Sequence, residues 1–378
     1  MSAPVIVAAR RSPIGRAGGG LRQVGAADLA APVLAAVRSE VDAHPVSEVV
    51  LGNCMGPGGD VARVAALAAG LPVDVPGLTV DRQCGSGLAA ITVAAALVSS
   101  QPGLVLAGGV ESASTQPWRS WPPVRETAPV RYLRAPFAPP GFADPDMGEA
   151  ADRLAAAYGI GREAQDVYAA RSHARAVAAA AAGDYAAELV PVAGLDRDER
   201  PRASVTPGFL SRMSPEFRTA ADGGTVTIGN SCGVNDGAAV VAVLDGESHA
   251  RTRSPGLRIL ACASAGVDPD QPGIGLVPAT RVALDRAGVG LDEIDVVELN
   301  EAFAGQILAC CTALDLDPAR VCPQGGALAL GHPWGASGAV LVVRLFSQLV
   351  RTGRTGALGL AAIAVGGGQG VAMVVQAC

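Results

Sequence analysis

Lysine is absent from this chain of 378 residues, and all 29 of its basic residues are arginine. The absence of lysine excludes Schiff-base catalysis, a lysine-anchored pyridoxal phosphate and a nucleotide-binding phosphate loop. Acidic residues number 35, which gives a formal net charge of −6 and a pI of about 5.3. No basic block stands out, so the sequence predicts no nucleic-acid partner.

Cysteine and histidine are sparse, and no two cysteines form a C-x-x-C pair. Eight cysteines scattered along a long chain argue against a disulfide framework and against a zinc site, so we expect no metal. Only four histidines are available for imidazole chemistry. They are residues 44, 173, 249 and 332.

Long hydrophobic runs are also missing from the sequence. No apolar run approaches about 18 residues free of charges and glycine-rich breaks, so we expect no membrane span. The N-terminal stretch lacks an apolar core of the length that a signal peptide needs, and a cytoplasmic protein is the expectation. Aromatic residues make up 3% of a chain that is 49% hydrophobic, which predicts an aliphatic core.

Apolar segments with strand character alternate with segments of helical spacing at both ends of the chain. This alternation, with several strands apolar throughout, predicts an α/β fold whose sheet is covered on both faces. Strands are expected at 3–11, 47–55, 77–84, 103–112, 256–266 and 292–299 and as two strands within 355–376, and helices at 26–41, 60–72, 86–101, 273–289, 301–314 and 335–350.

Residues 117–230 have a different character. The stretch 118–148 contains seven prolines and four arginines, which excludes a regular helix or strand, and a long amphipathic stretch follows at 162–190. We interpret 117–230 as an inserted loop-rich domain over the core, between one half formed by 1–116 with 231–250 and another formed by 251–378.

The two ends of the chain resemble each other. A Ser-Gly pair, a buried helix, a short polar link, a buried strand and glycines occur in this order after residue 86 and again, 251 residues later, after residue 337. This similarity predicts a duplicated fold, in which the two Ser-Gly helices pack against each other at the centre.

Candidate catalytic residues occur at three sites, each at the end of a predicted helix or strand. Cys84 lies just before a helix, where the helix dipole lowers a thiol pKa, although a buried core cysteine is the simpler alternative. His332 is expected at the matching strand-to-helix junction of the second half, which favours a catalytic over a structural histidine. Asn300, with Glu301 and Phe303 nearby, follows a strand and either faces a ligand or caps a helix that begins at Glu301.

These segments together resemble the thiolase family. The stretch "DRQCGSGLAAI" resembles the nucleophile segment of that family, and "NEAFAGQ", "GGALALGHPWGASGA" and "AIAVGGGQG" resemble its other motifs in the same order. The resemblance spans essentially the whole chain. It implies a duplicated five-layered αβαβα core with an inserted loop domain, coenzyme A thioester substrates with no bound cofactor, and a homodimer or homotetramer.

The resemblance also implies roles for particular residues. Cys84 is the nucleophile that forms an acyl-enzyme, and His332 activates it and helps to stabilise a thioester oxyanion. Asn300 orients a water molecule that completes this oxyanion hole. The backbone N–H groups of Cys84 and Gly366 form a second hole, so the glycine cluster is a backbone wall and not a phosphate cradle. The expected activity is acyl-CoA C-acyltransfer, with Claisen-type C–C bond formation or cleavage at a β-keto thioester.

One position departs from the family pattern in a way that affects this chemistry. Ala364 occupies the place of a second cysteine that acts as general acid/base, and a methyl group cannot move a proton. Water or another thiol, with Cys232 as a candidate, can substitute. Otherwise the enzyme runs a decarboxylative condensation or an acyl transfer to a heteroatom, or the chain is a weakly active partner subunit. A papain-like hydrolase is disfavoured by the duplicated α/β context of Cys84 and His332.

The substrate-binding residues that the resemblance implies are less sharply placed. Trp334 stands where the family carries an aliphatic residue, which predicts a narrowed pocket. Met147 and Phe303 are expected to bind the substrate or its coenzyme A moiety, Cys232 to lie near the bound thioester, and Arg202 and Phe217 to lie near the coenzyme A contacts.

Overall fold

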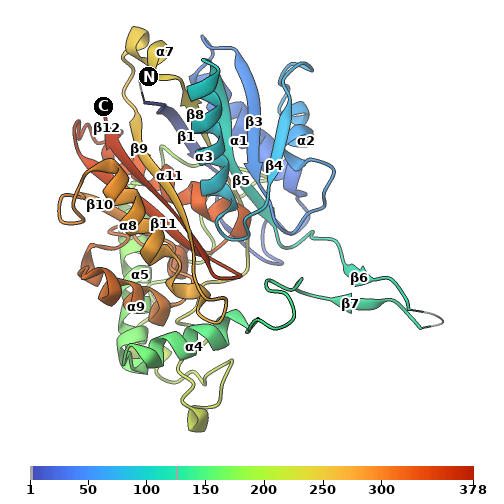
Figure 1. Ribbon diagram of the computed structural model, residues 1–378, viewed down its shortest axis with the longest axis vertical. Helices are drawn as coiled ribbons and strands as arrows, with labels where there is room; N and C mark the ends of the chain where they lie inside the picture. The colour runs from blue at the N-terminus through green and yellow to red at the C-terminus, as the bar shows by residue number, and fades with distance from the viewer. Residues whose placement is uncertain (1–2, 125–126) are drawn as a thin grey trace.

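The computed structural model describes residues 3–124 and 127–378, and its main feature is one long sheet that divides into two halves (Figure 1). The strand order is β10-β11-β12-β9-β1-β8-β5-β3-β4, with β2 added beside β8. The short antiparallel contact between β1 and β9 joins the halves. The strands of this sheet are β1 (Val5–Arg11), β2 (Gly15–Arg16), β3 (Val46–Gly52), β4 (Gly77–Val80), β5 (Leu104–Ser112), β8 (Asn235–Leu244), β9 (Leu257–Gly266), β10 (Val296–Leu299), β11 (Leu358–Val365) and β12 (Gln369–Ala377).

The two halves of the sheet repeat the same topology. In the first half β3 pairs parallel with β5, which pairs antiparallel with β8, which pairs antiparallel with β1. In the second half β10, β11, β12 and β9 repeat this order and these directions. The duplication predicted from the Ser-Gly helices is therefore confirmed.

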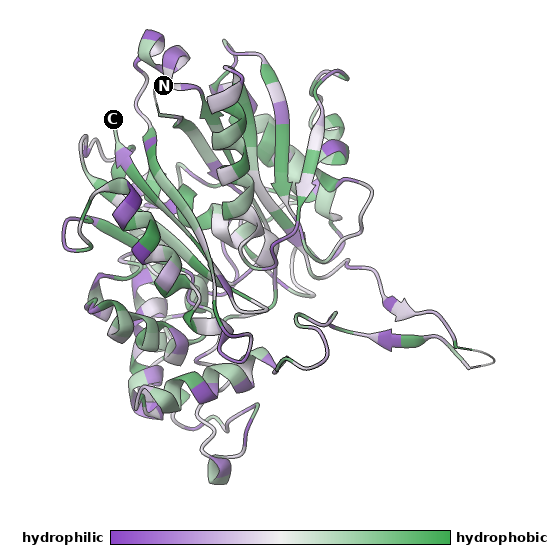
Figure 2. Ribbon diagram, viewed as in Figure 1, coloured by the Kyte–Doolittle hydropathy of each residue, from purple (hydrophilic) through white to green (hydrophobic). Residues whose placement is uncertain are grey.

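Helices cover both faces of each half of the sheet. They are α1 (Ala26–Glu40), α2 (Val61–Ala68), α3 (Ser86–Ser100), α4 (Met147–Ala157), α5 (Arg162–Ala182), α6 (Pro207–Leu210), α7 (Gly246–Thr252), α8 (Leu276–Ala287), α9 (Ala304–Leu314), α10 (Ala327–Leu330) and α11 (Trp334–Leu349). Side chains of α3 and α11 share one core with strands of both halves, α1 and α2 form a second core, and α8 and α9 form a third. These layers confirm the five-layered αβαβα architecture, and Figure 2 shows the hydrophobic strands between the helices.

The central helices α3 and α11 pack at their Ser-Gly pairs. A Cβ atom on Gly87 would lie 2.8 Å from the carbonyl oxygen of Gly335, and one on Gly338 would lie 2.5 Å from the backbone nitrogen of Leu88. Only glycine therefore lets the two backbones approach this closely. The predicted contact of the two Ser-Gly helices is confirmed.

The segment after β5 leaves the body of the protein as a two-stranded ribbon, β6 (Arg119–Trp121) and β7 (Val130–Tyr132) (Figure 1). The prediction that the proline-rich stretch 118–148 forms no regular strand is wrong, because β6 and β7 lie within it. Its prolines flank the strands, and the rings of Trp121 and Tyr132 stack across the ribbon at 4.9 Å. The long amphipathic stretch that follows is α5, which ends at Gly183 in the left-handed conformation.

One helical stretch, Gln83–Ser100, is long and apolar enough to pass a length-and-composition test for a membrane span. The sequence predicted no such span. This stretch contains α3, and 56% of it is buried within the protein. Because α3 lies between the two halves of the sheet, its apolar character is that of a core helix.

Candidate active site

Cys84 lies at the tight turn that leads from β4 into α3. Gln83, just before it, adopts a positive φ of 46°, a strained conformation of the kind found at functional sites. The hydroxyl group of Ser86 accepts a hydrogen bond from the Arg82 N–H at 2.8 Å and donates one to the Gln83 carbonyl at 2.6 Å. This turn lies against β11, because a Cβ atom on Gly85 would lie 2.7 Å from the side chain of Val365.

The pKa of the Cys84 thiol differs from the sequence-based expectation. Burial raises it to about 11, and the backbone groups of Gly366 and of Cys84 itself only partly oppose this increase. The prediction that the helix start lowers this pKa is therefore wrong for the free protein, because the loss of water outweighs the stabilisation of the thiolate by these backbone groups. Cys84 is a protonated thiol at neutral pH until a base or a bound substrate changes its surroundings.

The glycine cluster near the C-terminus is the hairpin turn between β11 and β12. Val365 pairs with Gln369, and the loop between them uses positive φ angles of 81° at Gly367 and 77° at Gly368. A strand follows the cluster, as predicted, which argues against a dinucleotide-binding loop. A Cβ atom on Gly366 would lie 2.6 Å from the ring of Phe137, so the proline-rich segment packs directly on this turn.

His332 lies two residues before the start of α11, just as Cys84 lies two residues before the start of α3. The segment preceding His332 is the short helix α10. The predicted junction is therefore wrong in that a helix, and not a strand, comes before His332. The Ser337 hydroxyl group lies 2.6 Å from Nδ1 of the His332 ring and fixes its orientation. The backbone N–H of His332 donates to Asn235 Oδ1 at 3.0 Å. Burial lowers the pKa of His332 to about 4, which keeps the imidazole neutral at physiological pH.

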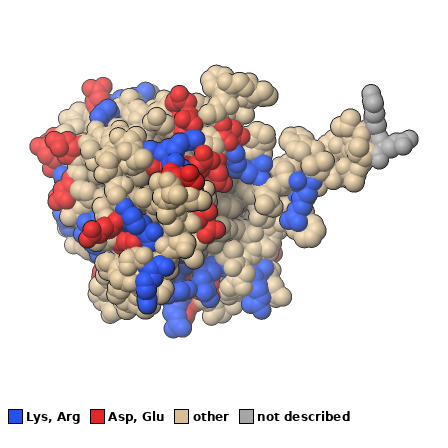
Figure 3. Space-filling model, turned by 90° about the horizontal axis from the view of Figure 1, so that it is seen from below, with Lys and Arg blue, Asp and Glu red and all other residues tan. Residues whose placement is uncertain are grey.

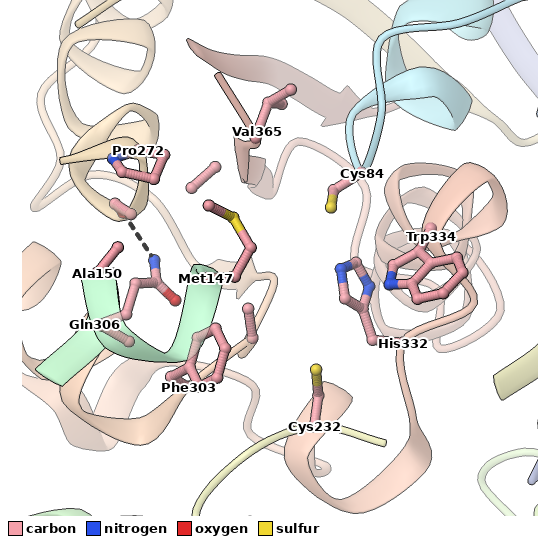
Figure 4. Close-up of a pocket in the computed structure, with 15 residues that line it drawn as sticks. Cys84, Met147, Ala150, Cys232, Pro272, Phe303, Gln306, His332, Trp334 and Val365 are labelled. Atoms are coloured by element: carbon pink, nitrogen blue, oxygen red, sulfur yellow. Dashed lines mark hydrogen bonds between the residues drawn. The ribbon is translucent and has the colours of Figure 1, made fainter. Parts of the chain in front are cut away.

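Cys84 and His332 face one cavity, which has a largely apolar lining (Figure 4). In this view the imidazole of His332 lies between the thiols of Cys84 and Cys232. We call this the central cavity. It brings together eight of the predicted site residues: Cys84, Met147, Cys232, Phe303, His332, Trp334, Ala364 and Gly366.

Three predicted site residues do not line the central cavity. Asn300 lines a second, narrow cavity together with Ser337, whose hydroxyl group contacts Nδ1 of His332. Phe217 reaches the site only indirectly, because its ring packs edge-on against Phe303 at 6.3 Å. Arg202 is exposed, and its backbone N–H bonds to His173 Nδ1 at 3.3 Å.

The alternative that Asn300 caps a helix beginning at Glu301 is wrong. The next helix, α9, begins at Ala304, because the intervening backbone pairs with another segment. The Ala302 carbonyl accepts from the Cys232 N–H at 2.9 Å, and the Ala304 N–H donates to the Asn230 carbonyl at 3.0 Å.

Sequence reasoning missed two residues at this site. Gln306 donates from Nε2 to the Gly273 carbonyl at 3.0 Å, which leaves its Oε1 atom facing the central cavity without a partner in the described residues (Figure 4). Phe137 covers Gly366. The "NEAFAGQ" motif contained Gln306, but nothing in the sequence indicated that a proline-rich loop would reach Gly366.

The comparisons with known proteins agree with this geometry. Residues 4–247 match the family model described as thiolase, N-terminal domain, and residues 253–377 match thiolase, C-terminal domain. The chain belongs to the thiolase family. An acetyl-CoA acetyltransferase of Pseudomonas aeruginosa is 41% identical over 98% of both chains. The crystal structure of the Bacillus anthracis acetyl-CoA acetyltransferase has a TM-score of 0.91 and 38% identity, and the match covers 100% of this chain and 99% of that one.

These matches confirm the thiolase resemblance and the thiolase fold, and they place the chain among acyltransferases. Within residues 3–124 and 127–378, no group of three or more His, Cys, Asp or Glu residues is arranged to hold a metal ion.

Proposed function

We propose that this thiolase-family protein is an acyl-CoA C-acyltransferase that forms a covalent acyl-Cys84 intermediate. The observation that carries the proposal is the convergence of Cys84, His332 and Gly366 on the wall of one cavity. A neutral imidazole accepts the thiol proton, and the resulting thiolate attacks the thioester carbonyl. The overall reaction forms or cleaves a C–C bond at the β-keto position of a coenzyme A thioester.

The backbone N–H groups of Cys84 and Gly366 stabilise the oxyanion of the acyl-enzyme in this proposal. Both groups lower the pKa of the Cys84 thiol, as donors aimed at the sulfur would. Preorganised donors of this kind contribute roughly 3–4 kcal/mol each to transition-state stabilisation. His332, with a water molecule oriented by Asn300, serves the oxyanion of the other thioester.

The coenzyme A moiety lies outside the apolar central cavity in this proposal, near Phe217 and the exposed Arg202. Arginine must bind any phosphate, because the chain has no lysine. Figure 3 shows one face of the protein hollowed near its middle, with arginine and acidic side chains around the hollow. We further infer that the enzyme works in the cytoplasm as a homodimer or homotetramer.

Ala364 supports a second candidate function, because it lines the central cavity with a methyl group. An enzyme without an α-proton base would carry out decarboxylative condensation or acyl transfer to a heteroatom. A weakly active partner subunit is the remaining alternative.

Mass spectrometry tests the covalent intermediate directly. Incubation with acetyl-CoA and other short acyl-CoAs should add one acyl group to the Cys84 peptide, and Cys84→Ser should abolish this mass increase. Absence of an adduct with every thioester would refute covalent acyl transfer. The subunit alternative predicts no adduct for the protein alone and an active complex with a copurified partner.

A further inference from the structure

The central cavity offers few groups that can move a proton. Of the 15 residues that line it, three carry a titratable side chain: Cys84, Cys232 and His332. If Cys84 carries the acyl group and His332 serves as the proton carrier, Cys232 is the remaining group.

Backbone contacts hold Cys232 beside both parts of the site. Its N–H donates to the carbonyl oxygen of Ala302, which also lines the cavity, at 2.9 Å. The preceding residue, Ser231, bridges to Phe303, and Val234 bridges to His332. The segment is therefore fixed on two sides, and Figure 4 shows the Cys232 thiol directed toward the imidazole of His332.

The surroundings of Cys232 suit a thiol that first gives up a proton and then recovers it. Burial raises its pKa to about 12, so the resting group is a protonated thiol, and the charge of Arg200 opposes this increase. The Arg200 guanidinium has a weak contact from Nη2 to the Leu328 carbonyl at 3.4 Å, and its buried Nε atom has no partner among the described residues. A cation that is only partly neutralised therefore lies near Cys232 and stabilises its thiolate.

We propose that Cys232 is the second acid/base group of this enzyme and moves the proton at the substrate α-carbon in place of a group at position 364. The inference rests on the proposed function. In condensation, the Cys84 proton passes to His332, the Cys84 thiolate attacks the first thioester, and His332 gives this proton to the departing coenzyme A thiolate. His332 then accepts the proton of Cys232, and the Cys232 thiolate removes the α-proton of the second thioester. The carbanion attacks the acyl-Cys84 carbonyl, and His332 protonates the Cys84 thiolate that is expelled.

Two measurements on the same proteins separate this role from the acylation step. The first is formation of the acyl-Cys84 adduct from acetyl-CoA, followed by mass spectrometry. The second is exchange of the acetyl-CoA α-protons in deuterium oxide, followed by proton NMR. Wild type, Cys232→Ser, Cys232→Ala and the Cys232→Ser/Ala364→Cys double variant are compared. Cys262→Ser is the control, because Cys262 is a half-buried thiol that does not line the central cavity.

Both Cys232 variants should form the acyl adduct at rates within a few-fold of wild type. Their α-proton exchange should slow by about 10²–10⁴-fold, the usual contribution of general acid/base catalysis. The double variant should regain most of this exchange, and Cys262→Ser should match wild type in both measurements.

Each other outcome overturns the assignment. Unchanged exchange in Cys232→Ser assigns the α-proton to His332 or to water. Loss of both adduct and exchange in Cys232→Ser indicates a structural role. A wild-type enzyme that forms the adduct without exchanging α-protons supports the decarboxylative or heteroatom reaction and excludes this role of Cys232. A wild-type enzyme that forms no adduct refutes the proposed function itself, and the inference fails with it.

Discussion

The hydroxyl oxygen of Ser337 lies 2.6 Å from Nδ1 of His332, within the first turn of α11. Its counterpart in the other half, Ser86, bonds to the backbone of Arg82 and Gln83 at the first residue of α3. Each serine of the repeated Ser-Gly pair therefore fixes the reactive residue of its own half. Ser337 holds the ring of His332, and Ser86 holds the backbone turn that carries Cys84.

Replacing Ser337 with alanine should slow formation of the acyl-Cys84 adduct by about fivefold. The imidazole would lose the partner that fixes its orientation, and one such hydrogen bond is worth about 1 kcal/mol. Rapid-quench mass spectrometry over a range of pH measures the rate. Ser337→Thr should recover most of the rate, and Ser100→Ala, at the C-terminal end of α3, is the control. Equal rates and equal pH profiles for Ser337→Ala and wild type would show that Ser337 does not position His332.

Alkylation of Cys84 by iodoacetamide in the free enzyme should be slow at pH 7 and rise about tenfold per pH unit up to pH 10. The thiolate is the reactive form, and burial raises the pKa of Cys84 to about 11. Peptide mapping separates Cys84 from the other seven cysteines. A rate that levels off near pH 7–8 would contradict the raised pKa of Cys84. It would show that the helix dipole, and not burial, sets the pKa of this thiol.

The sequence supported the fold more securely than the electrostatics of the site. The Ser-Gly repeat predicted both the duplication and the contact of Gly87 with α11, because a close backbone approach requires a residue without a side chain. The pKa of Cys84 was predicted in the wrong direction, because burial depends on distant segments such as the glycine hairpin. The position of Asn300 also depends on such a segment, since pairing of the following residues with 230–232 delays the start of α9.

Gly338→Ala should destabilise the protein by about 1–3 kcal/mol or more, because the added methyl group would meet backbone atoms of α3. A Cβ atom at this position would lie 2.5 Å from the backbone nitrogen of Leu88, which cannot rotate away. Urea denaturation measures the change in the free energy of unfolding. Gly208→Ala is the matched control, since no atom lies within 4 Å of a Cβ atom added there. Equal stability of the two variants would contradict the close packing of the central helices.

Acidification from pH 6.5 to pH 4 should destabilise the fold in part through His173. Burial, and then the charges of Arg200 and Arg202, lower the pKa of His173 to about 4. An unfolded histidine has a pKa near 6.5, so the unfolded chain binds more protons in this range and stability falls as the pH falls. His173→Gln removes this contribution, which approaches about 1.4 kcal/mol per pH unit. Chemical denaturation at several pH values should give a shallower slope for the variant, and an unchanged slope would contradict the lowered pKa.

Trp334→Leu should shift the acyl preference of the enzyme toward bulkier groups. The Trp334 side chain lines the central cavity beside His332, and a smaller aliphatic residue leaves space for additional methylene groups (Figure 4). One methylene group in a hydrophobic pocket changes specificity by about 10–200-fold, so the ratio of kcat/KM for a branched or longer acyl-CoA to that for acetyl-CoA should rise by at least tenfold. The control is Trp118→Leu, because Trp118 is 80% exposed and does not line the cavity. If the ratio stays constant in Trp334→Leu, the acyl group does not extend toward Trp334, and Met147, Phe303 and Gln306 on the opposite wall are the residues that limit its size.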